Sequence, residues 1–165
     1  MASPELSAKL NDLMNGELRA HNIYLQMAAW ASGRNLDGVR GFLLGHAAEE
    51  RGHMMKFFDY LDELSAPISL DTVDKPTVSA NNVKELFLQL QAEEKAVSQN
   101  IFEVIGIARD ERDYATDQFL QWFAAEQHEE EKLAQAILDK IDLIGEGPNS
   151  LYLFDLEIAK MGAGD

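Results

Sequence analysis

Acidic side chains recur at matching positions in the two halves of the sequence. Glu17 precedes Glu50 by 33 residues, and Glu94 precedes Gln127 by the same 33 residues. A chain that repeats this spacing is interpreted as two helical hairpins with equivalent positions for side chains that could hold a metal ion. Carboxylate oxygens are ligands for hard or borderline cations, so this is where chemistry is expected.

A further polar residue follows three positions after the later member of each pair. His53 follows Glu50, and Glu130 follows Gln127. Because positions i and i+3 share one face of a helix, each pair can converge on one site. Carboxylates with one imidazole suit iron or manganese, whereas structural zinc would favour more histidine or cysteine. The two halves therefore predict two metal ions, with Glu50 as a bridge between them.

These polar groups interrupt apolar stripes that should face the protein core. An isolated buried carboxylate costs on the order of several kcal/mol. The basic residues Arg51, Lys56 and Lys95 do not fall on the stripes, so bound cations are the best remaining compensation. The alternative interpretation is a polar bundle core that is satisfied by hydrogen bonds and water.

The elements that must position these residues are predicted to be helices. Apolar steps of three and four residues indicate an all-α protein, a four-helix bundle with a long crossover between the second and third helices and a short C-terminal fifth helix. We expect one domain over residues 1–165, with the bundle at about 4–143 and the fifth helix at about 149–160. The last residues, 161–165, should fray. The long helices should cover about 4–31, 36–64, 82–109 and from just after Asp110 to 143.

The segment 65–81 differs from the rest because it holds two prolines and no helical period. A helix of about 28 residues is about 42 Å long. Seventeen extended residues can reach about 56 Å, so this segment can cross the full length of the bundle. Two antiparallel hairpins joined by one crossover form the simplest topology. Either Asn81 or Asn82 can cap the helix that follows.

Composition narrows the classes of function. The chain has 14 Lys and Arg against 29 Asp and Glu, a net charge of −15. We expect no direct binding to nucleic acid or to an anionic membrane, since both need basic patches. The absence of cysteine excludes disulfides, thiol catalysis and cysteine-ligated metal clusters. No secretory leader or long apolar run is recognisable, so the expected location is the cytoplasm.

Three motifs resemble the ferritin-like di-iron proteins, and the non-haem bacterial ferritins most closely. They are Asn15-Gly-Glu17-Leu, His46-Ala-Ala-Glu-Glu-Arg-Gly-His53 and Gln121-Trp-Phe-Ala-Ala-Glu-Gln-His-Glu-Glu-Glu131. The resemblance covers nearly the whole chain and implies a ferritin-like fold. It also implies a homo-oligomer, a hollow shell of 24 subunits in which the short last helix lines a symmetry axis.

The resemblance implies a pair of iron sites that share one carboxylate. The implied ligands are Glu17, Glu50 and His53 for the first site, and Glu50, Glu94 and Glu130 for the second. Gln127 takes the place of a ligand and is expected only to hydrogen-bond near the metals. Tyr24 matches the family's tyrosine beside the iron pair, although a core tyrosine with an ordinary hydrogen bond is the alternative.

A third, inner iron site is implied for Glu49, Glu126 and Glu129, together with Glu130. Helical spacing supports it, because residues 126, 129 and 130 share a face. Acidic runs are commonly solvated surfaces, which is the competing interpretation.

Four more side chains near these motifs are expected to have structural rather than chemical roles. Trp122 could lend an electron, but we favour simple packing. His46 is expected to be a satisfied core histidine or to lie behind the ligands, while His21 and His128 are expected at the surface or behind the ligands. Arg51 stands where haem-binding relatives carry methionine, so no haem is expected.

The resulting functional expectation is a ferroxidase and iron store. Fe(II) would be oxidised by O₂ or H₂O₂ at the paired site and kept as a ferric oxyhydroxide mineral. Two other classes stay open: a di-metal redox enzyme acting on peroxide or an organic substrate, and a helical interaction module without catalysis.

Overall fold

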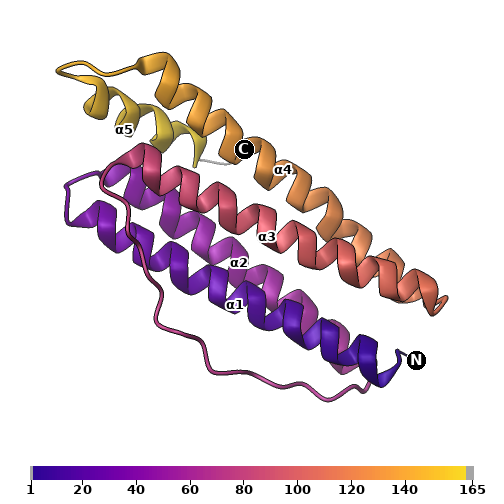
Figure 1. The fold of residues 1–165 in the computed structure, drawn as a ribbon. Helices are drawn as coiled ribbons and strands as arrows, with labels where there is room; N and C mark the ends of the chain where they lie inside the picture. Colours follow the sequence, from indigo (N-terminus) through magenta and orange to yellow (C-terminus); the bar gives the residue numbers. More distant parts are fainter. Residues whose placement is uncertain (1, 163–165) are drawn as a thin grey trace.

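The computed structural model of this chain describes residues 2–162, and all regular secondary structure within them is helical (Figure 1). This confirms the predicted all-α bundle with a short fifth helix, and the predicted helix ends differ from the observed ones by only a few residues. Met161 still belongs to the last helix, and residues 163–165 lie outside the described residues. The helices are α1 (Pro4–Ser32), α2 (Asp37–Glu63), α3 (Val83–Asp110), α4 (Tyr114–Ile144) and α5 (Ser150–Met161).

Side-chain caps start the helices where the sequence carries capping residues. The Ser3 hydroxyl accepts a hydrogen bond from the Leu6 amide at 3.0 Å, with Pro4 in the first turn. Of the two candidate caps for α3, Asn82 is the one used, since its Oδ1 accepts from the Glu85 amide at 2.9 Å. Caps of this kind stabilise a helix by about 1 kcal/mol.

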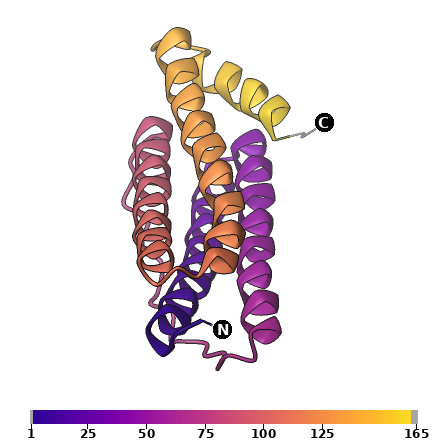
Figure 2. The ribbon, with the colours of Figure 1, turned by 90° about the vertical axis from the view of Figure 1, so that its right-hand side faces the viewer.

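The helices form two antiparallel hairpins joined by one crossover, as predicted. Helix α1 packs mainly against α2, and α3 packs mainly against α4. The connecting segment leaves the end of α2 and runs along the outside of the bundle to the opposite end, where α3 begins (Figure 1). Figure 2 shows α5 at one end of the bundle, beside α2 and α4.

Two asparagines of α1 fasten the crossover to the bundle. The Asn11 side chain donates to the Pro67 carbonyl at 2.8 Å and accepts from the Ser69 amide at 2.8 Å. One turn later, Asn15 donates to the Ser69 carbonyl at 2.8 Å and accepts from the Asp71 amide at 2.9 Å. These bonds place the backbone of Asp71 directly beside α1.

Helix α5 is fastened to the start of α2 by a carboxylate. Asp155 accepts hydrogen bonds from the amides of Gly38, at 3.1 Å, and Val39, at 2.9 Å. It therefore caps α2 from a distant part of the chain, since Leu36 at the N-cap makes no side-chain bond of its own. Gly38 is required here because a Cβ at this position would lie 1.9 Å from the Asp155 carbonyl oxygen.

Two apolar clusters fill the bundle, and the predicted polar residues lie between them. One cluster, at the α5 end, contains Ala20, Ala47, Leu90 and Ala134. The other, at the far end, contains Leu13, Phe57, Ile101 and Phe123. Each long helix therefore passes from one apolar cluster to the other through a short polar stretch. Within residues 2–162, none of the helices has both the length and the apolar composition that crossing a membrane requires.

Candidate metal centre

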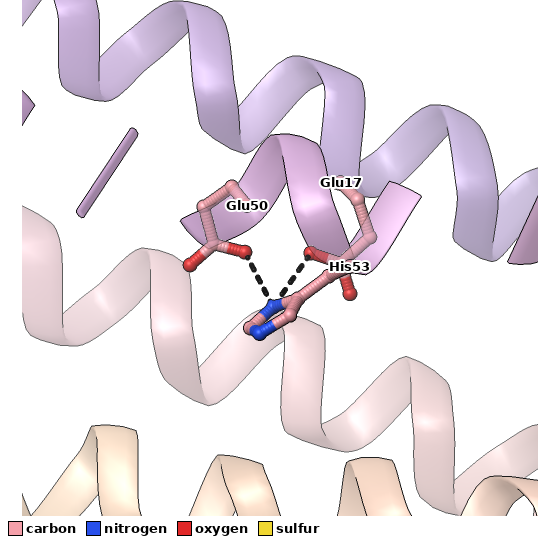
Figure 3. A group of neighbouring side chains, drawn as sticks. All are labelled: Glu17, Glu50 and His53. Atoms are coloured by element: carbon pink, nitrogen blue, oxygen red, sulfur yellow. Dashed lines mark hydrogen bonds and ion pairs between the residues drawn. The ribbon is translucent and has the colours of Figure 1, made fainter. Parts of the chain in front are cut away.

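The first group of ligand-type side chains is carried by the first hairpin. Glu17 comes from α1, and Glu50 and His53 come from one face of α2 (Figure 3). All three are buried, and one ligand atom from each lies within 4.8 Å of the others. His53 Nδ1 is 3.1 Å from Glu50 Oε2 and 3.9 Å from Glu17 Oε2. This set is the one predicted for the first metal.

The second group joins the two hairpins. It consists of His46 from α2, Glu94 from α3 and Glu130 from α4, all buried. His46 Nε2 lies 3.0 Å from Glu94 Oε1 and 3.5 Å from Glu130 Oε2. The same nitrogen is 3.7 Å from Glu50 Oε1, so the imidazole stands among the three carboxylates predicted for the second metal.

Three carboxylate oxygens in these groups are buried without a hydrogen-bond partner among the described residues. They are Glu17 Oε2, Glu50 Oε1 and Glu130 Oε2. A buried unsatisfied polar atom costs about 1–3 kcal/mol, and more when it is charged. No lysine or arginine within residues 2–162 forms an ion pair with any of the three carboxylates. The arrangement therefore leaves a requirement for positive charge, which a bound cation would meet.

The pKa values of the first ligand group reflect the same shortage of positive charge around its carboxylates. Burial and the charge of Glu50 raise the pKa of Glu17 well above its ordinary value. Burial also acts to raise the pKa of Glu50, but the hydrogen bond from His53 and the further interactions with Glu17, His53 and His46 together outweigh burial and lower that pKa. Burial acts to lower the pKa of His53, while the bond to Glu50 and that carboxylate's charge raise it. Glu17 is thus the carboxylate left without compensation.

His46 provides the compensation in the second group. Burial acts to lower its pKa, but the hydrogen bond to Glu94 and the charges of Glu130, Glu94 and Glu50 raise it to about 9. Burial raises the pKa of Glu130 to about 8, although His46 opposes that rise. At neutral pH the imidazole is therefore a cation inside the carboxylate cluster. Sequence reasoning expected a satisfied core histidine or one behind the ligands here, and it missed this position at the centre of the second group.

Two further predicted residues fasten Glu94 from opposite sides. The Tyr24 hydroxyl donates to Glu94 Oε1 at 2.5 Å. Gln127 donates through Nε2 to Glu94 Oε2 at 3.1 Å, and also contacts the Glu94 carbonyl oxygen and Ser98 Oγ. Burial and the charge of Glu94 raise the pKa of Tyr24 well above its ordinary value, so its proton stays on the phenol. Gln127 thus hydrogen-bonds to Glu94 of the second group.

The residues predicted for a third site are less enclosed. Glu49 Oε2 is 3.9 Å from His46 Nδ1, but its side chain is 60% exposed. Glu126 Oε1 is 3.8 Å from His53 Nε2 with its side chain 32% exposed, and Glu129 is exposed. Among the described residues, only the first and second groups bring ligand atoms of three such residues all within 4.8 Å of one another, so the structure does not bring this third set together.

Three further residues singled out in the sequence lie outside the two ligand groups: Trp122, His21 and His128. The Trp122 ring meets His53 edge-on, with centroids 5.4 Å apart, and Lys56 Nζ lies 4.4 Å from its centroid. Trp122 therefore packs against His53 and lies under the Lys56 side chain. His21 Nδ1 is 2.6 Å from the Ala47 carbonyl oxygen, and His128 is exposed.

Comparisons with known proteins point to one family. The family model described as a ferritin-like domain matches residues 7–144. A bacterial non-heme ferritin of Escherichia coli is 40% identical over 161 residues, covering 98% of either chain. One from Campylobacter jejuni is 39% identical, covering 94% of this chain and 93% of its own. A solved open-pore ferritin from the archaeon Archaeoglobus fulgidus has a TM-score of 0.93 at 33% identity, covering 96% of this chain and 98% of that one.

Proposed function

The chain belongs to the ferritin family, and we propose that it oxidises Fe(II) with O₂ at the paired carboxylate site and stores the product as ferric oxyhydroxide. Iron storage is the function that the family supports. The observation that carries the ferroxidase proposal is the set of three buried, unpartnered carboxylate oxygens on Glu17, Glu50 and Glu130. Such a set, with imidazoles beside it, favours a pair of hard or borderline cations.

The ligands we propose form two sites around Glu50. Glu17, Glu50 and His53 would hold the first Fe(II), and Glu50, Glu94 and Glu130 would hold the second. One Glu50 oxygen contacts His53 of the first group, and the other lies 3.7 Å from His46 of the second. Glu50 therefore already reaches both sites. For the second ion to bind, the His46 ring must give up its place among the carboxylates.

The chemistry proposed for this site is a two-electron reduction of O₂. Each Fe(II) gives one electron, so a pair of ions reduces one O₂ to the level of H₂O₂ as two Fe(III) form. Carboxylates favour this step because their negative charge stabilises Fe(III) more than Fe(II). Tyr24 and Gln127 would hold Glu94 in position through hydrogen bonds to its two oxygens. H₂O₂ is an alternative oxidant for the same pair.

Storage requires an enclosed cavity, and we propose the 24-subunit homo-oligomer of the family. Large apolar side chains exposed on α5 support contacts between copies, because exposed apolar patches mark interaction surfaces. They are Leu151, Tyr152, Leu153 and Leu156. The net charge of −15 per chain would concentrate Fe(II) at such a shell. Glu49, Glu126 and Glu129, together with Glu130, would then form a third, more open iron site beside the pair.

The test uses apo-protein that elutes as one species from a sizing column. It is loaded anaerobically with Fe(II) in excess, O₂ is admitted, and oxygen uptake and the iron retained after desalting are measured. Rapid uptake with far more iron retained than three ions per chain supports storage. Uptake with only about two ions retained would instead indicate a di-metal redox enzyme, and no uptake would contradict the ferroxidase proposal.

A further inference from the structure

The last residue of the acidic run 129–131 takes no part in the proposed function, but its side chain bonds across the second hairpin. Ser98 Oγ of α3 donates a hydrogen bond to Glu131 Oε1 of α4 at 2.6 Å. Ser98 is 2% exposed, and Glu131 is half-buried. Ser98 follows Glu94 by one turn of α3, and Glu131 follows Gln127 by one turn of α4. The bond therefore lies beside the second ligand group.

The Ser98 hydroxyl has one hydrogen and two acceptors within reach. Besides Glu131 Oε1 at 2.6 Å, the Glu94 carbonyl oxygen lies 3.1 Å away. A serine inside a helix often bonds to the carbonyl four residues earlier, but a hydrogen bond to a carboxylate is shorter and stronger. The hydrogen therefore points to Glu131, which leaves the lone pairs of the Ser98 oxygen for another donor.

The Gln127 side chain is the donor that meets this oxygen. Its Nε2 is 3.3 Å from Ser98 Oγ and 3.1 Å from Glu94 Oε2. The two ends of a glutamine amide have nearly the same shape, so the hydrogen-bond partners decide which end faces a given group. Because the Ser98 hydrogen is already donated to Glu131, only the NH₂ end of Gln127 fits here. The same NH₂ group then donates to Glu94.

The direction of these hydrogen bonds matters for Glu94, a proposed ligand of the second ion. If the Gln127 amide were reversed, its carbonyl oxygen would face a carboxylate oxygen, and two acceptors form no hydrogen bond. Glu94 is 1% exposed, so the lost donor would leave a buried oxygen unsatisfied. A carboxylate only accepts, so Glu131 fixes the direction of every bond from itself to Glu94.

We propose that Ser98 and Glu131 are positioning residues for the second metal ion, because they orient the Gln127 amide so that it donates to Glu94. The inference rests on the proposed function, since it assumes that Glu94 binds that ion. Groups that hold a metal ligand typically change metal affinity by about 10–100-fold when they are removed. Ser98 and Glu131 act one bond further out, so their effect should be smaller, roughly threefold to tenfold.

The principal test removes the Ser98 hydroxyl and follows Co²⁺ binding to whole apo-protein by its visible absorption, under anaerobic conditions. The absorption change that Glu94→Ala abolishes defines binding at the second site. Ser98→Ala should weaken this binding roughly threefold to tenfold and leave the first site unchanged. Ser98→Thr keeps the hydroxyl and should restore the unmodified affinity. Ser7→Ala is the control, because Ser7 is also buried but lies about 15 Å along α1 from Glu17.

A second variant changes the acceptor that fixes the direction. Glu131→Gln keeps the size of the side chain, but an amide can donate as well as accept, so the direction is no longer enforced. It should weaken the second site about as much as Ser98→Ala does. The double variant should be no weaker than either single one, because both changes break the same chain of bonds. Asp139→Asn is the control, since Asp139 is an exposed α4 carboxylate that accepts from Gln135 at 2.8 Å.

The outcomes separate a positioning role from a structural one. An unchanged second site in Ser98→Ala would overturn the proposal. Equal weakening of both sites, or no recovery in Ser98→Thr, would also overturn it, because the bond would then only hold α3 against α4. Additive losses in the double variant would show that the two residues act separately and would contradict the proposed chain.

The same measurements distinguish this inference from the proposed function. If the variants behave as predicted but the unmodified protein takes up no O₂ with Fe(II), the ferroxidase proposal fails while the positioning role stands. If O₂ uptake is rapid but neither variant changes the second site, the positioning role fails alone. If the unmodified protein has no Co²⁺ site that depends on Glu94, both fail.

Discussion

The two ligand groups are built from the same residue types but meet their need for positive charge differently. Each group keeps one buried carboxylate oxygen without a hydrogen-bond partner among the described residues, Glu17 Oε2 in the first and Glu130 Oε2 in the second. In the second, His46 Nε2 stands 3.0 Å from Glu94 and carries a pKa of about 9. The second group thus holds an imidazole among three carboxylates, whereas in the first group His53 is hydrogen-bonded to Glu50 and lies 3.9 Å from Glu17 Oε2. We infer that the first metal binds to a prepared site and the second must displace a charged imidazole.

The largest effect on the rate of O₂ uptake is expected when Glu50 is replaced, because both proposed metal sites share this residue. Glu50→Ala should lower the rate of Fe(II)-dependent O₂ uptake by roughly a hundredfold or more, because each proposed site loses a ligand. Oxygen-electrode traces at fixed Fe(II) measure this. Glu63→Ala, an exposed carboxylate on the same helix, is the control and should keep the unmodified rate. Normal uptake in Glu50→Ala would place the chemistry elsewhere.

Replacing the two histidines separately tests the contrast itself. His53→Gln should weaken metal binding at the first site by roughly tenfold to a hundredfold, as expected when one ligand is lost. His46→Gln should leave metal affinity unchanged or raise it, because it removes the internal cation that competes for Glu94 and Glu130. Anaerobic Co²⁺ titrations of both variants measure the affinities. Equal losses in the two variants would show that His46 is a ligand and remove the distinction.

The apo-protein should lose stability as the pH rises from about 6.5 to about 9. The pKa of His46 is raised from 6.5 to about 9, so its contribution is complete below pH 6.5 and is lost as the pH passes about 9. Glu130, with its pKa raised to about 8, acts in the same direction because the folded state holds its proton longer. One unit of pKa difference corresponds to about 1.4 kcal/mol, so His46 should contribute roughly 3 kcal/mol.

Urea unfolding of metal-free protein at several pH values measures this loss. His46→Gln is the matched variant and should flatten the dependence, while added metal should replace the protons and reduce it. Stability that is constant or rising between these pH values would contradict the assignment of an internal cation to the second group.

A smaller effect is expected from the hydrogen bond that steadies Glu94. Tyr24→Phe removes the donor at 2.5 Å from Glu94 Oε1 but keeps the buried ring. Since a hydrogen bond to a charged group contributes about 1.5–3 kcal/mol, O₂ uptake should slow by roughly tenfold. The number of Fe(II) ions bound should not change. Tyr114→Phe is the matched control. It should leave O₂ uptake unaltered, because Tyr114 at the start of α4 is exposed.

The smallest effect on the rate of O₂ uptake is expected from the three glutamates proposed for the third site. Removing Glu49, Glu126 and Glu129 together as alanine variants should change the initial rate of O₂ uptake by no more than roughly threefold, because these groups are partly or fully exposed. The iron bound per chain in an anaerobic titration should fall by one. A loss of initial rate as large as that of Glu50→Ala would mean that this set belongs to the pair.

Most of the fold and the predicted ligand set follow from the spacing of residues along helices. The equal intervals from Glu17 to Glu50 and from Glu94 to Gln127 required only that the helices be long and the turns short. The crossover was recognisable because Pro67 and Pro76 break the helical period. Local rules of this kind need no knowledge of how the two hairpins are set against each other.

Features that depend on contacts between hairpins could not be predicted. His46 occupies the same stripe as Glu50, but its meeting with Glu94 and Glu130 depends on the side-chain rotamer and on the distance between hairpins. The capping of α2 by Asp155 also joins segments far apart in sequence. The hydrogen bonds that Asn11 and Asn15 make to the crossover likewise depend on a contact with no periodic signal.

The central claim is that two metal ions bind side by side on a shared Glu50. It is tested most directly by crystals of the apo-protein soaked anaerobically with Fe(II) and measured at the iron absorption edge. Our account predicts two anomalous peaks per subunit, one beside Glu17 and His53 and one beside Glu94 and Glu130, with Glu50 between them. A single peak, or iron bound only at exposed carboxylates, would contradict it.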